Sequence, residues 1–255
     1  VVGWKGLIND PDLDGSFHIN KGLHLARRVL LDVAALGLPA ASEFLDTTFG
    51  QYYAELVSFG AIGARTVESQ IHRELASGLS MPVGFKNGTD GQIEVALDAI
   101  QSARHGHWFP SITKEGTPAI LRSEGNPHGY LILRGGRRSG PNYHEKDVHD
   151  AAVALADKGL TPSLIVDCSH GNSEKDPSRQ AEVMSALCEQ IEHQQGAIRG
   201  IMLESHLVGG SQAVSKGREL TYGQSITDAC LSLAETAPLL ELLAAAVRKS
   251  GEQHG

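Results

Sequence analysis

Six short apolar stretches of the chain each end in, or lead directly into, a side chain that can take part in chemistry. Three of these side chains are cations, two are carboxylates and one is an imidazole. In chain order they are Glu43, Arg65, Lys86, Arg134, His170 and Glu204. A single charged residue after a strand is most often solvated or caps a helix. The occurrence of such a side chain at the end of six consecutive strands indicates a functional site.

The three cations predict a binding site for an anionic substrate. Arg65, Lys86 and Arg134 would converge in the mouth of an otherwise acidic protein. Guanidinium groups bind phosphate and carboxylate through paired hydrogen bonds, so we expect a substrate that carries both kinds of group.

A second group of residues could hold a metal ion. His170, Glu204 and Asp228 offer one imidazole and two carboxylates, which suit a divalent first-row metal such as Mn²⁺, Fe²⁺, Co²⁺ or Zn²⁺. Two alternatives stay open. Asp228, in SITDACLSLAE, could instead cap or start the final helix. Glu204 could be a general base or a buried partner of Arg134.

The three cysteines have no spacing typical of a disulfide framework, which favours free thiols in a reducing cytoplasm. Cys188 lies at helical spacing among apolar residues and is expected to pack in the core. Cys230 is expected to do the same in the last helix. Cys168, in VDCSHGN, is two residues from His170, and its neighbourhood alone does not decide between a metal ligand, a nucleophile and a packed strand residue.

Apolar strands alternate with amphipathic helices along the chain. The strand candidates cover residues 40–45, 61–65, 82–86, 130–134, 164–169 and 198–203. The helical patterns cover residues 21–37, 90–100, 145–159 and 177–196. Strands that are apolar at nearly every position indicate a parallel sheet covered by helices. Six such units in series favour an α/β fold of the TIM (β/α)8 type, and the lack of GxGxxG after any strand disfavours a Rossmann domain.

Two features modify this barrel. Residues 108–123, WFPSITKEGTPAILRS, predict two short strands around a KEG turn, which is a β-hairpin inserted between a helix and a barrel strand. The chain also opens abruptly, on VVGWKGLIND, and supplies six strands where a barrel needs eight. We therefore expect the first two strands to lie upstream of residue 1. Residues 1–247 are expected to form a single, partial catalytic domain, with a disordered tail over 248–255.

The bulk composition excludes several classes of protein. The chain has 255 residues, of which 41% are hydrophobic and 20% charged, as in soluble globular proteins. Its net charge of −8 and pI of about 5.8 argue against nucleic-acid or anionic-membrane partners. It has neither a signal peptide nor an apolar run of roughly 18–20 residues, so a cytoplasmic location is expected.

Several motifs together resemble the class I 3-deoxy-D-arabino-heptulosonate 7-phosphate (DAHP) synthases. They are GWKGLINDP, EFLD, GAIGARTVESQIHRELASGLS, PVGFKNGTDG, LRGG, DCSHGNS and YGQSITDAC. The resemblance runs from residue 1 to about residue 247. It implies a TIM barrel with an inserted hairpin, and the condensation of phosphoenolpyruvate with erythrose 4-phosphate and water in the shikimate pathway.

The resemblance also assigns roles to the residues at the strand ends. Arg65, Lys86 and Arg134 would hold phosphoenolpyruvate, helped by the backbone at Gly63 and Ala64. Glu43 would lie beside that site. His170, Glu204 and Asp228 match three of four metal ligands, and the metal would polarise the aldehyde of erythrose 4-phosphate. His170, Lys86 and Glu43 are the catalytic candidates. Relatives often carry Phe at Cys168, which favours packing for this thiol.

The chain departs from the family pattern at its start. The fourth metal ligand of the family is a cysteine on the first strand, and a Lys-Pro-Arg-Thr segment follows the second. Both are expected before Val1, so we expect this chain alone to be nearly inactive. The full-length protein is expected to form a homo-dimer or homo-tetramer.

Feedback inhibition by Phe, Tyr or Trp near the hairpin is also implied by the resemblance. Gly50 in FGQYY, together with EGNPHGY and TYGQSITD, indicates the tryptophan-sensitive branch. Gly50 could instead be only a flexible helix start.

Two alternative functions remain. One is 3-deoxy-octulosonate 8-phosphate synthase, against which the hairpin and GARTVESQIHRE argue. The other is a non-catalytic remnant with a regulatory or assembly role.

Overall fold

The computed structural model describes residues 4–193, 196–215 and 219–252. The chain divides into two compact units. The first comprises Val1–Phe85 with Asp98–Gly129, and the second comprises Lys86–Leu97 with Tyr130–Gly255.

The first unit is built on parallel strands. β1 (Ala41–Glu43) pairs with β2 (Phe59–Ile62), with Ala41 opposite Phe59, and β2 pairs with β3 (Val83–Lys86), with Gly60 opposite Val83. Its core includes the fully buried side chains of Phe44, Ile62 and Phe85. Its helical elements are α1 (Ile19–Ala35), the 3-10 turns η1 (Gly50–Tyr52) and η2 (Ala54–Leu56), and α2 (Gln70–Ser77).

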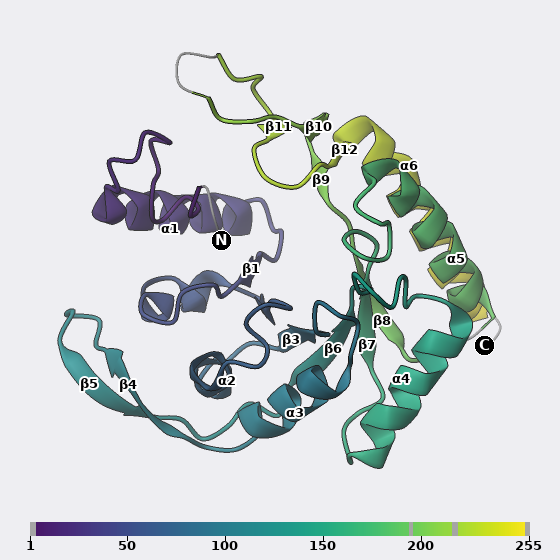
Figure 1. The fold of residues 1–255 in the computed structure, drawn as a ribbon, viewed down its shortest axis with the longest axis horizontal. Helices are drawn as coiled ribbons and strands as arrows, with labels where there is room; N and C mark the ends of the chain where they lie inside the picture. Colours follow the sequence, from purple (N-terminus) through teal and green to yellow (C-terminus); the bar gives the residue numbers. More distant parts are fainter. Residues whose placement is uncertain (1–3, 194–195, 216–218, 253–255) are drawn as a thin grey trace. The chain divides into compact units, whose positions relative to one another are not determined.

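The inserted hairpin forms as predicted. β4 (Trp108–Ile112) and β5 (Pro118–Arg122) are antiparallel, with Trp108 opposite Arg122. The turn between them carries Gly116 at a φ of +78°, a left-handed conformation that glycine adopts without strain. Figure 1 shows the hairpin as a long two-stranded arm.

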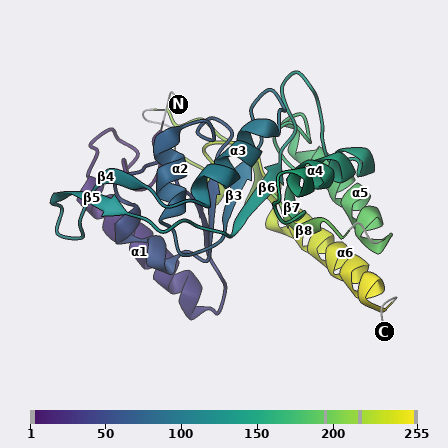
Figure 2. The ribbon, with the colours of Figure 1, turned by 90° about the horizontal axis from the view of Figure 1, so that it is seen from below.

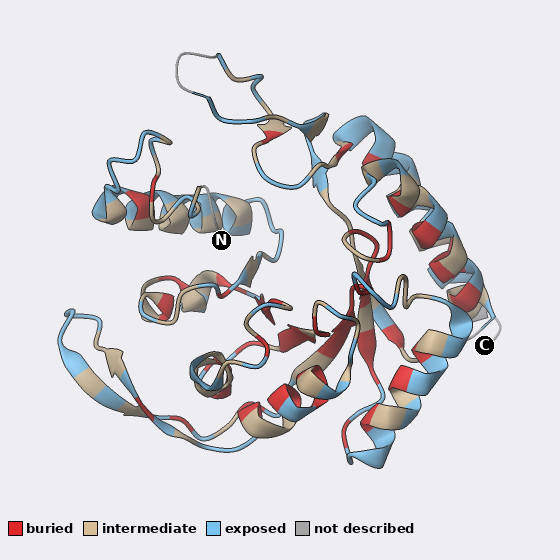
Figure 3. Ribbon diagram, viewed as in Figure 1, coloured by how far each residue is buried: buried red, intermediate tan, exposed pale blue. Residues whose placement is uncertain are grey.

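The second unit also has a parallel sheet, in the order β6-β7-β8. β6 (Gly129–Leu133), β7 (Leu164–Asp167) and β8 (Ile198–Met202) pair with Leu131 opposite Leu164 and Leu164 opposite Ile198. α4 (Glu145–Asp157), α5 (Gln180–Glu192) and α6 (Leu233–Glu252) lie on one side of these strands (Figures 1 and 2). Figure 3 shows β6 and β7 as largely buried, as their apolar sequences predict, whereas β8 is mostly half-buried.

Short elements complete the second unit. α3 (Glu94–Ala103) begins in it, and the 3-10 turn η3 (Pro177–Arg179) leads into α5. Two small parallel pairs follow β8: β9 (Ser205–His206) with β12 (Leu231–Ser232), and β10 (Val208–Ser211) with β11 (Gln224–Ser225). They form part of the segment that carries Asp228.

The last helix differs from the prediction at both ends. α6 begins only at Leu233, so neither Asp228 nor Cys230 belongs to it, and the alternative that Asp228 caps this helix is wrong. Ser232 takes that place, because it exchanges hydrogen bonds with Glu235. At the other end the helix continues to Glu252, through most of the predicted tail; residues 253–255 lie outside the described residues. Within the described part of the chain, no helix has the length and apolarity needed to cross a membrane.

Candidate functional site

The three predicted metal-binding side chains lie together in the second unit. His170 follows β7, Glu204 follows β8 and Asp228 lies before β12, and one potential ligand atom from each lies within 4.8 Å of the others. His170 Nε2 is 3.5 Å from Glu204 Oε1. One imidazole nitrogen and two carboxylates form a donor set that fits a divalent first-row metal ion.

The electrostatics of this cluster favour a cation. Burial raises the pKa of Glu204, and the neighbouring carboxylates of Asp228 and Asp167 raise it further, against the opposing effect of His170 and Lys86. Carboxylates held this close repel one another unless a positive charge lies between them. A bound divalent ion would supply that charge.

A buried carboxylate, Asp167, lies behind the imidazole. Its side chain is 3% exposed, and its Oδ2 is 3.0 Å from His170 Nδ1 and 2.9 Å from Lys86 Nζ. Burial alone would raise the pKa of Asp167, but the hydrogen bond with His170, the charge of Lys86 and the hydrogen bonds of Ser169 lower it well below its ordinary value. Asp167 therefore links a predicted metal ligand to a predicted substrate-binding cation. Asp167 was not among the predicted site residues, although an acid at the end of an apolar strand is a signal that the sequence contains.

The loops that follow β6 and β7 are in backbone contact. The Gly171 N–H donates to the Arg134 carbonyl at 2.9 Å. A Cβ on Gly171 would lie 2.6 Å from the Gly135 carbonyl carbon, and a Cβ on Gly135 would lie 2.5 Å from the Gly171 carbonyl carbon. Only glycine allows this approach, which fixes the backbone next to His170. His170 itself has a φ of +55°, an uncommon conformation for a residue with a side chain.

Three asparagines tie the same loops together. Asn87 Oδ1 accepts from the Arg134 N–H at 2.8 Å, and Asn142 Oδ1 accepts from the Gly135 N–H at 2.7 Å. Asn172 Oδ1 accepts from the Asn142 N–H at 2.8 Å, and its Nδ2 donates to the Asp167 carbonyl at 2.8 Å. Asn87 and Asn172 are buried. Amide side chains can donate and accept at once, which suits them to the irregular backbone beyond the strand ends.

Glu204 is held by a side chain from α5. The fully buried Gln180 accepts from the Glu204 N–H at 2.8 Å and donates to the Glu204 carbonyl at 3.1 Å. This amide pairs with the backbone as a neighbouring strand would. Gln180 was not predicted either, since no local pattern distinguishes it from other helix residues.

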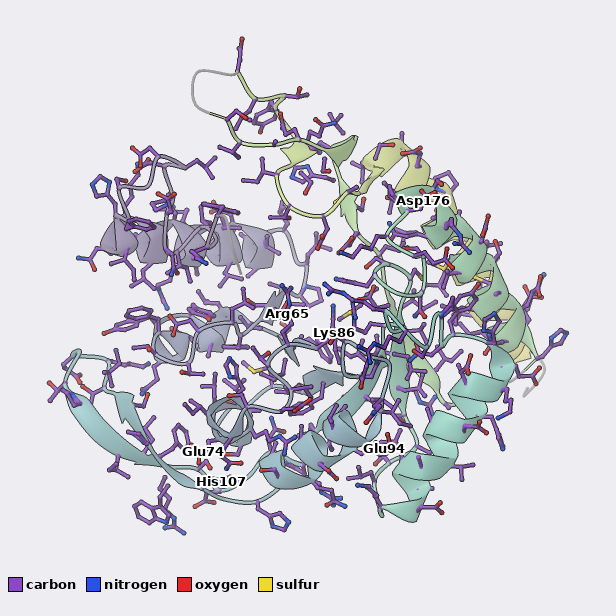
Figure 4. All side chains as sticks on the ribbon, viewed as in Figure 1. Arg65, Glu74, Lys86, Glu94, His107 and Asp176 are labelled. Carbon is purple, nitrogen blue, oxygen red and sulfur yellow. The ribbon has the colours of Figure 1, made fainter. Side chains whose placement is uncertain are left out.

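The substrate-binding candidates occur in both units. In the first, Glu43 ends β1, and Gly63 and Ala64 follow β2. A Cβ on Gly63 would lie 2.1 Å from Glu43 Oε1, so this carboxylate rests against the glycine. Arg65 is exposed in the turn after Gly63. In the second, Lys86 ends β3 and pairs with Asp167, and the buried Arg134 follows β6. Figure 4 labels Arg65 and Lys86.

The three cysteines lie in different environments. Cys168 is fully buried and is not in the cluster; burial raises the pKa of its thiol, which opposes thiolate formation. Cys188 is buried in α5, as predicted. Cys230 lies before α6 in partial contact with solvent, so the prediction that it packs within that helix is wrong.

The first unit contains a cavity of about 430 Å³. Apolar side chains from α2 and the hairpin line it, including Leu75, Phe109 and Leu121, with polar groups such as Ser77 and Arg122. Gly50, the first residue of η1, lies on its wall.

The sequence matches the family model described as the DAHP synthetase I family over residues 1–241. The "Phospho-2-dehydro-3-deoxyheptonate aldolase, Trp-sensitive" of Enterobacter agglomerans is 55% identical over 247 residues, which are 97% of this chain and 70% of that protein. The protein of the same name from Escherichia coli (strain K12) shows the same identity and the same shares. The solved structure of "Phospho-2-dehydro-3-deoxyheptonate aldolase from Francisella tularensis SCHU S4" matches with a TM-score of 0.94 at 54% identity, covering 98% of this chain and 72% of that one. The predicted α/β fold of the TIM type is thereby confirmed.

Proposed function

The chain belongs to the DAHP synthetase I family, and we propose on that basis that it condenses phosphoenolpyruvate with D-erythrose 4-phosphate and water. The products are 3-deoxy-D-arabino-heptulosonate 7-phosphate and inorganic phosphate, the first step of the shikimate pathway. The structural observation that carries the proposal is the cluster of His170, Glu204 and Asp228, in which one potential ligand atom from each lies within 4.8 Å of the others. The names of the relatives do not favour octulosonate synthesis or a non-catalytic remnant.

His170 Nε2 and the carboxylates of Glu204 and Asp228 are the proposed metal ligands, for Mn²⁺, Fe²⁺, Co²⁺ or Zn²⁺. When bound, the ion supplies a Lewis acid for the aldehyde oxygen of erythrose 4-phosphate. The protein contributes an imidazole nitrogen held by a buried hydrogen-bond network and two carboxylates that offset the charge of the ion. Residues around metal sites commonly orient the ligands through hydrogen bonds in this way.

Phosphoenolpyruvate is proposed to bind through Arg65, Lys86 and Arg134, with the backbone of Gly63 and Ala64 and with Glu43 beside it. Cations oriented in advance would offset the charges of the phosphate and carboxylate and hold the enol carbon in a reactive position. Lys86 supports this role, because its ammonium is already held by Asp167 at 2.9 Å. His170, Lys86 and Glu43 are the proposed catalytic residues.

A coupled assay of the full-length protein tests this reaction. Phosphate release should require both sugar phosphate and phosphoenolpyruvate, stop after chelation, and return with one of the four metals. His170→Ala should lower the rate at least about a hundredfold, since it removes a ligand of the Lewis acid. A stronger reaction with arabinose 5-phosphate, or phosphate release without any aldose, would contradict the proposal.

The cavity in the first unit is the proposed site for a tryptophan effector. Its volume of about 430 Å³ and its mixed lining suit an aromatic amino acid, with the rings of the ligand against Leu75 and Phe109 and its charged groups towards Ser77 and Arg122. Calorimetry should give tighter binding for tryptophan than for tyrosine or phenylalanine. Leu121→Arg, which places a charge in the cavity, should abolish the heat; equal binding of all three amino acids would contradict the assignment.

A homo-oligomer and a cytoplasmic location are also proposed. Trp108 and Ile120 of the hairpin are 70% and 62% exposed, and they lie on one face of it, because Ile120 pairs with Pro110, two residues from Trp108. Adjacent exposed apolar side chains commonly mark protein interfaces. Light scattering should show a smaller particle for Trp108→Ser with Ile120→Ser than for the control Tyr222→Ser, which changes a side chain that is 90% exposed in the second unit. The three unpaired cysteines suit a reducing compartment.

A further inference from the structure

We infer that Asp167 is a positioning residue that fixes the tautomer of His170, so that Nδ1 carries the proton and the lone pair of Nε2 faces Glu204 and Asp228. The inference rests on the proposed metal site and adds to it the residue that prepares the imidazole as a ligand.

The hydrogen bonds around Asp167 have a direction that can be followed from one fixed donor. The backbone N–H of Ser169 can only donate, and it donates to Asp167 Oδ1 at 2.9 Å. The hydroxyl of Ser169 lies 2.6 Å from the same oxygen. A carboxylate only accepts, so the hydroxyl proton points to Asp167.

The direction at His170 follows from these bonds. Ser169 Oγ lies 2.7 Å from His170 Nδ1, and since its proton is already used, it offers only a lone pair to the ring. Asp167 Oδ2, 3.0 Å from the same nitrogen, is a second acceptor. Both neighbours of Nδ1 accept, so Nδ1 must be the donor, and in the neutral ring Nε2 is then left with a lone pair.

The other face of the ring shows what this lone pair is for. Nε2 is 3.5 Å from Glu204 Oε1, so two acceptors face one another within the metal-binding cluster. Such a pair is unfavourable unless a cation or a proton lies between the two atoms. The tautomer set by Asp167 is therefore the one that a metal ligand needs, and it exists before any ion binds.

Asp167→Asn is a sharp test because the Ser169 N–H also orients the new amide. With its oxygen toward that N–H, the amide nitrogen lies toward His170 and toward Lys86, in place of the oxygen that accepts from the Lys86 ammonium in the wild-type protein. Nδ1 would then face a donor and become an acceptor, and the ring proton would move to Nε2. An asparagine in place of the aspartate that orients a functional histidine is known to produce this wrong tautomer with little change in geometry.

The experiment uses nitrogen-15 histidine NMR on the metal-free protein at about pH 8, above the ordinary pKa of histidine. The His170 signal is assigned by its loss in His170→Ala. The wild-type protein should show Nδ1–H for His170, and Asp167→Asn should show Nε2–H. Mn²⁺ affinity, measured by electron paramagnetic resonance, should fall about 10- to 100-fold in Asp167→Asn.

Two further variants separate the role of Asp167 from general effects. Asp150→Asn removes the same charge from the surface of α4 and should change neither readout. Ser169→Ala removes one acceptor of Nδ1 but leaves Asp167 Oδ2, so the Nδ1–H tautomer should persist. A switch to Nε2–H in Ser169→Ala would show that the serine sets the tautomer and would overturn the inference.

The wild-type spectrum decides the inference even if Asp167→Asn does not fold. Nε2–H on His170 in the wild-type protein would overturn it whether or not metal binds. A wrong assignment of the metal site would give a different result. In that case His170→Ala would bind Mn²⁺ as tightly as the wild-type protein, and the tautomer observed for His170 would be unaffected.

Discussion

At the scale of single residues, the proposed metal ligands depend on neighbours that would not touch the ion. Asp167 contacts the imidazole of His170, and Gln180 pairs with the backbone of Glu204. Asp228, by contrast, is exposed on the segment between β8 and α6. Two of the three ligands are thus held in advance, which lowers the entropic cost of binding an ion.

The support of Glu204 by Gln180 can be tested by Gln180→Leu. The change keeps the apolar bulk but leaves the Glu204 N–H and carbonyl without their partners, so stability should fall by about 1–3 kcal/mol. Because the ligand is no longer held, Mn²⁺ affinity in calorimetry should fall about tenfold or more.

Gln190→Leu is the matched control for this prediction. Gln190 lies on the same helix, is also buried, and donates to the Tyr143 carbonyl at 2.8 Å, away from the cluster. It should reduce stability without changing Mn²⁺ affinity. An equal loss of affinity in both variants would mean that α5 acts only through general stability.

The ligands themselves could be predicted from the sequence, and their supports could not. His170 and Glu204 each follow an apolar strand, and parallel strands end at a common edge, so their types and positions carry the signal. Gln180 acts through an element far along the chain from Glu204, and no sequence pattern reports such a pairing. Asp167 lies within the predicted strand 164–169, and for that reason it was not considered as a site residue.

At the scale of elements, two glycine-containing loops fix the backbone that carries Arg134 and His170. The backbones of Gly135 and Gly171 touch directly, and the Gly171 N–H bonds to the Arg134 carbonyl. The loop after β6 and the loop after β7 therefore cannot shift independently. This contact positions Arg134 and His170 together.

Gly171→Ala should break this contact. The new Cβ would lie 2.6 Å from the Gly135 carbonyl carbon and the Gly136 nitrogen, and backbone atoms cannot move aside as a side chain can. We expect chemical denaturation to show a free energy of unfolding lower by about 1–3 kcal/mol. Mn²⁺ binding should also weaken, because His170 would move.

Gly140→Ala provides the control, since a Cβ there meets nothing within 4 Å, although φ is +78°. Gly140→Ala should lower the free energy of unfolding by about 1–2 kcal/mol through backbone strain alone and leave Mn²⁺ affinity unchanged. If Gly171→Ala bound Mn²⁺ as well as Gly140→Ala does, the loop contact would have no role in the site.

The positions of most strands were predictable because they are apolar at nearly every residue, and β1, β2, β3, β6, β7 and β8 lie within a few residues of the six predicted strands. The helix α2 was missed, since QIHRELAS is short and mostly polar. The start of α6 was misjudged because SITDAC looks like a helix start, whereas the reciprocal hydrogen bonds of Ser232 and Glu235 lie four residues beyond Asp228.

Ser232→Ala should therefore weaken the start of α6 and lower the melting temperature by about 2–4 °C at neutral pH. The hydrogen bonds from Ser232 lower the pKa of Glu235. A lowered folded-state pKa means that the cap stabilises above the unfolded pKa of the carboxyl and that this contribution is lost as pH falls through the folded value. The difference between variant and wild type should shrink in acid; a difference that is the same at all pH values would exclude the Glu235 carboxylate from the cap.

At the scale of the whole molecule, the fold class and the family follow from the sequence, as the match to a solved relative at a TM-score of 0.94 bears out. The division into two compact units does not follow from it, because that division depends on contacts between segments far apart in the chain. The assignment of residues 1–247 to a single domain stays a prediction. The units matter for function, since the metal-binding cluster lies in the second and the cavity in the first.

Hydrogen exchange can assign each ligand to its unit. The metal-binding cluster lies wholly in the second unit and the cavity wholly in the first. A ligand at a hundredfold excess over its Kd stabilises the form that binds it by about 2.7 kcal/mol, which slows exchange through opening of that form about a hundredfold. Mn²⁺ should therefore slow exchange most at the amides of Gly171 and Glu204, and tryptophan most at those of Gly78 and Ser123.

His170→Ala separates the two effects, because it removes a proposed ligand of the metal and no residue of the cavity. It should abolish the protection by Mn²⁺ and keep the protection by tryptophan, whereas Leu121→Arg should do the reverse. Protection of Gly78 and Ser123 by Mn²⁺ that survives in His170→Ala would mean that the ion binds in the first unit, and the metal site would have to be sought there. Similar protection of all four amides by either ligand in the wild-type protein would mean that the two units do not open independently, so that each ligand stabilises the molecule as one cooperative body.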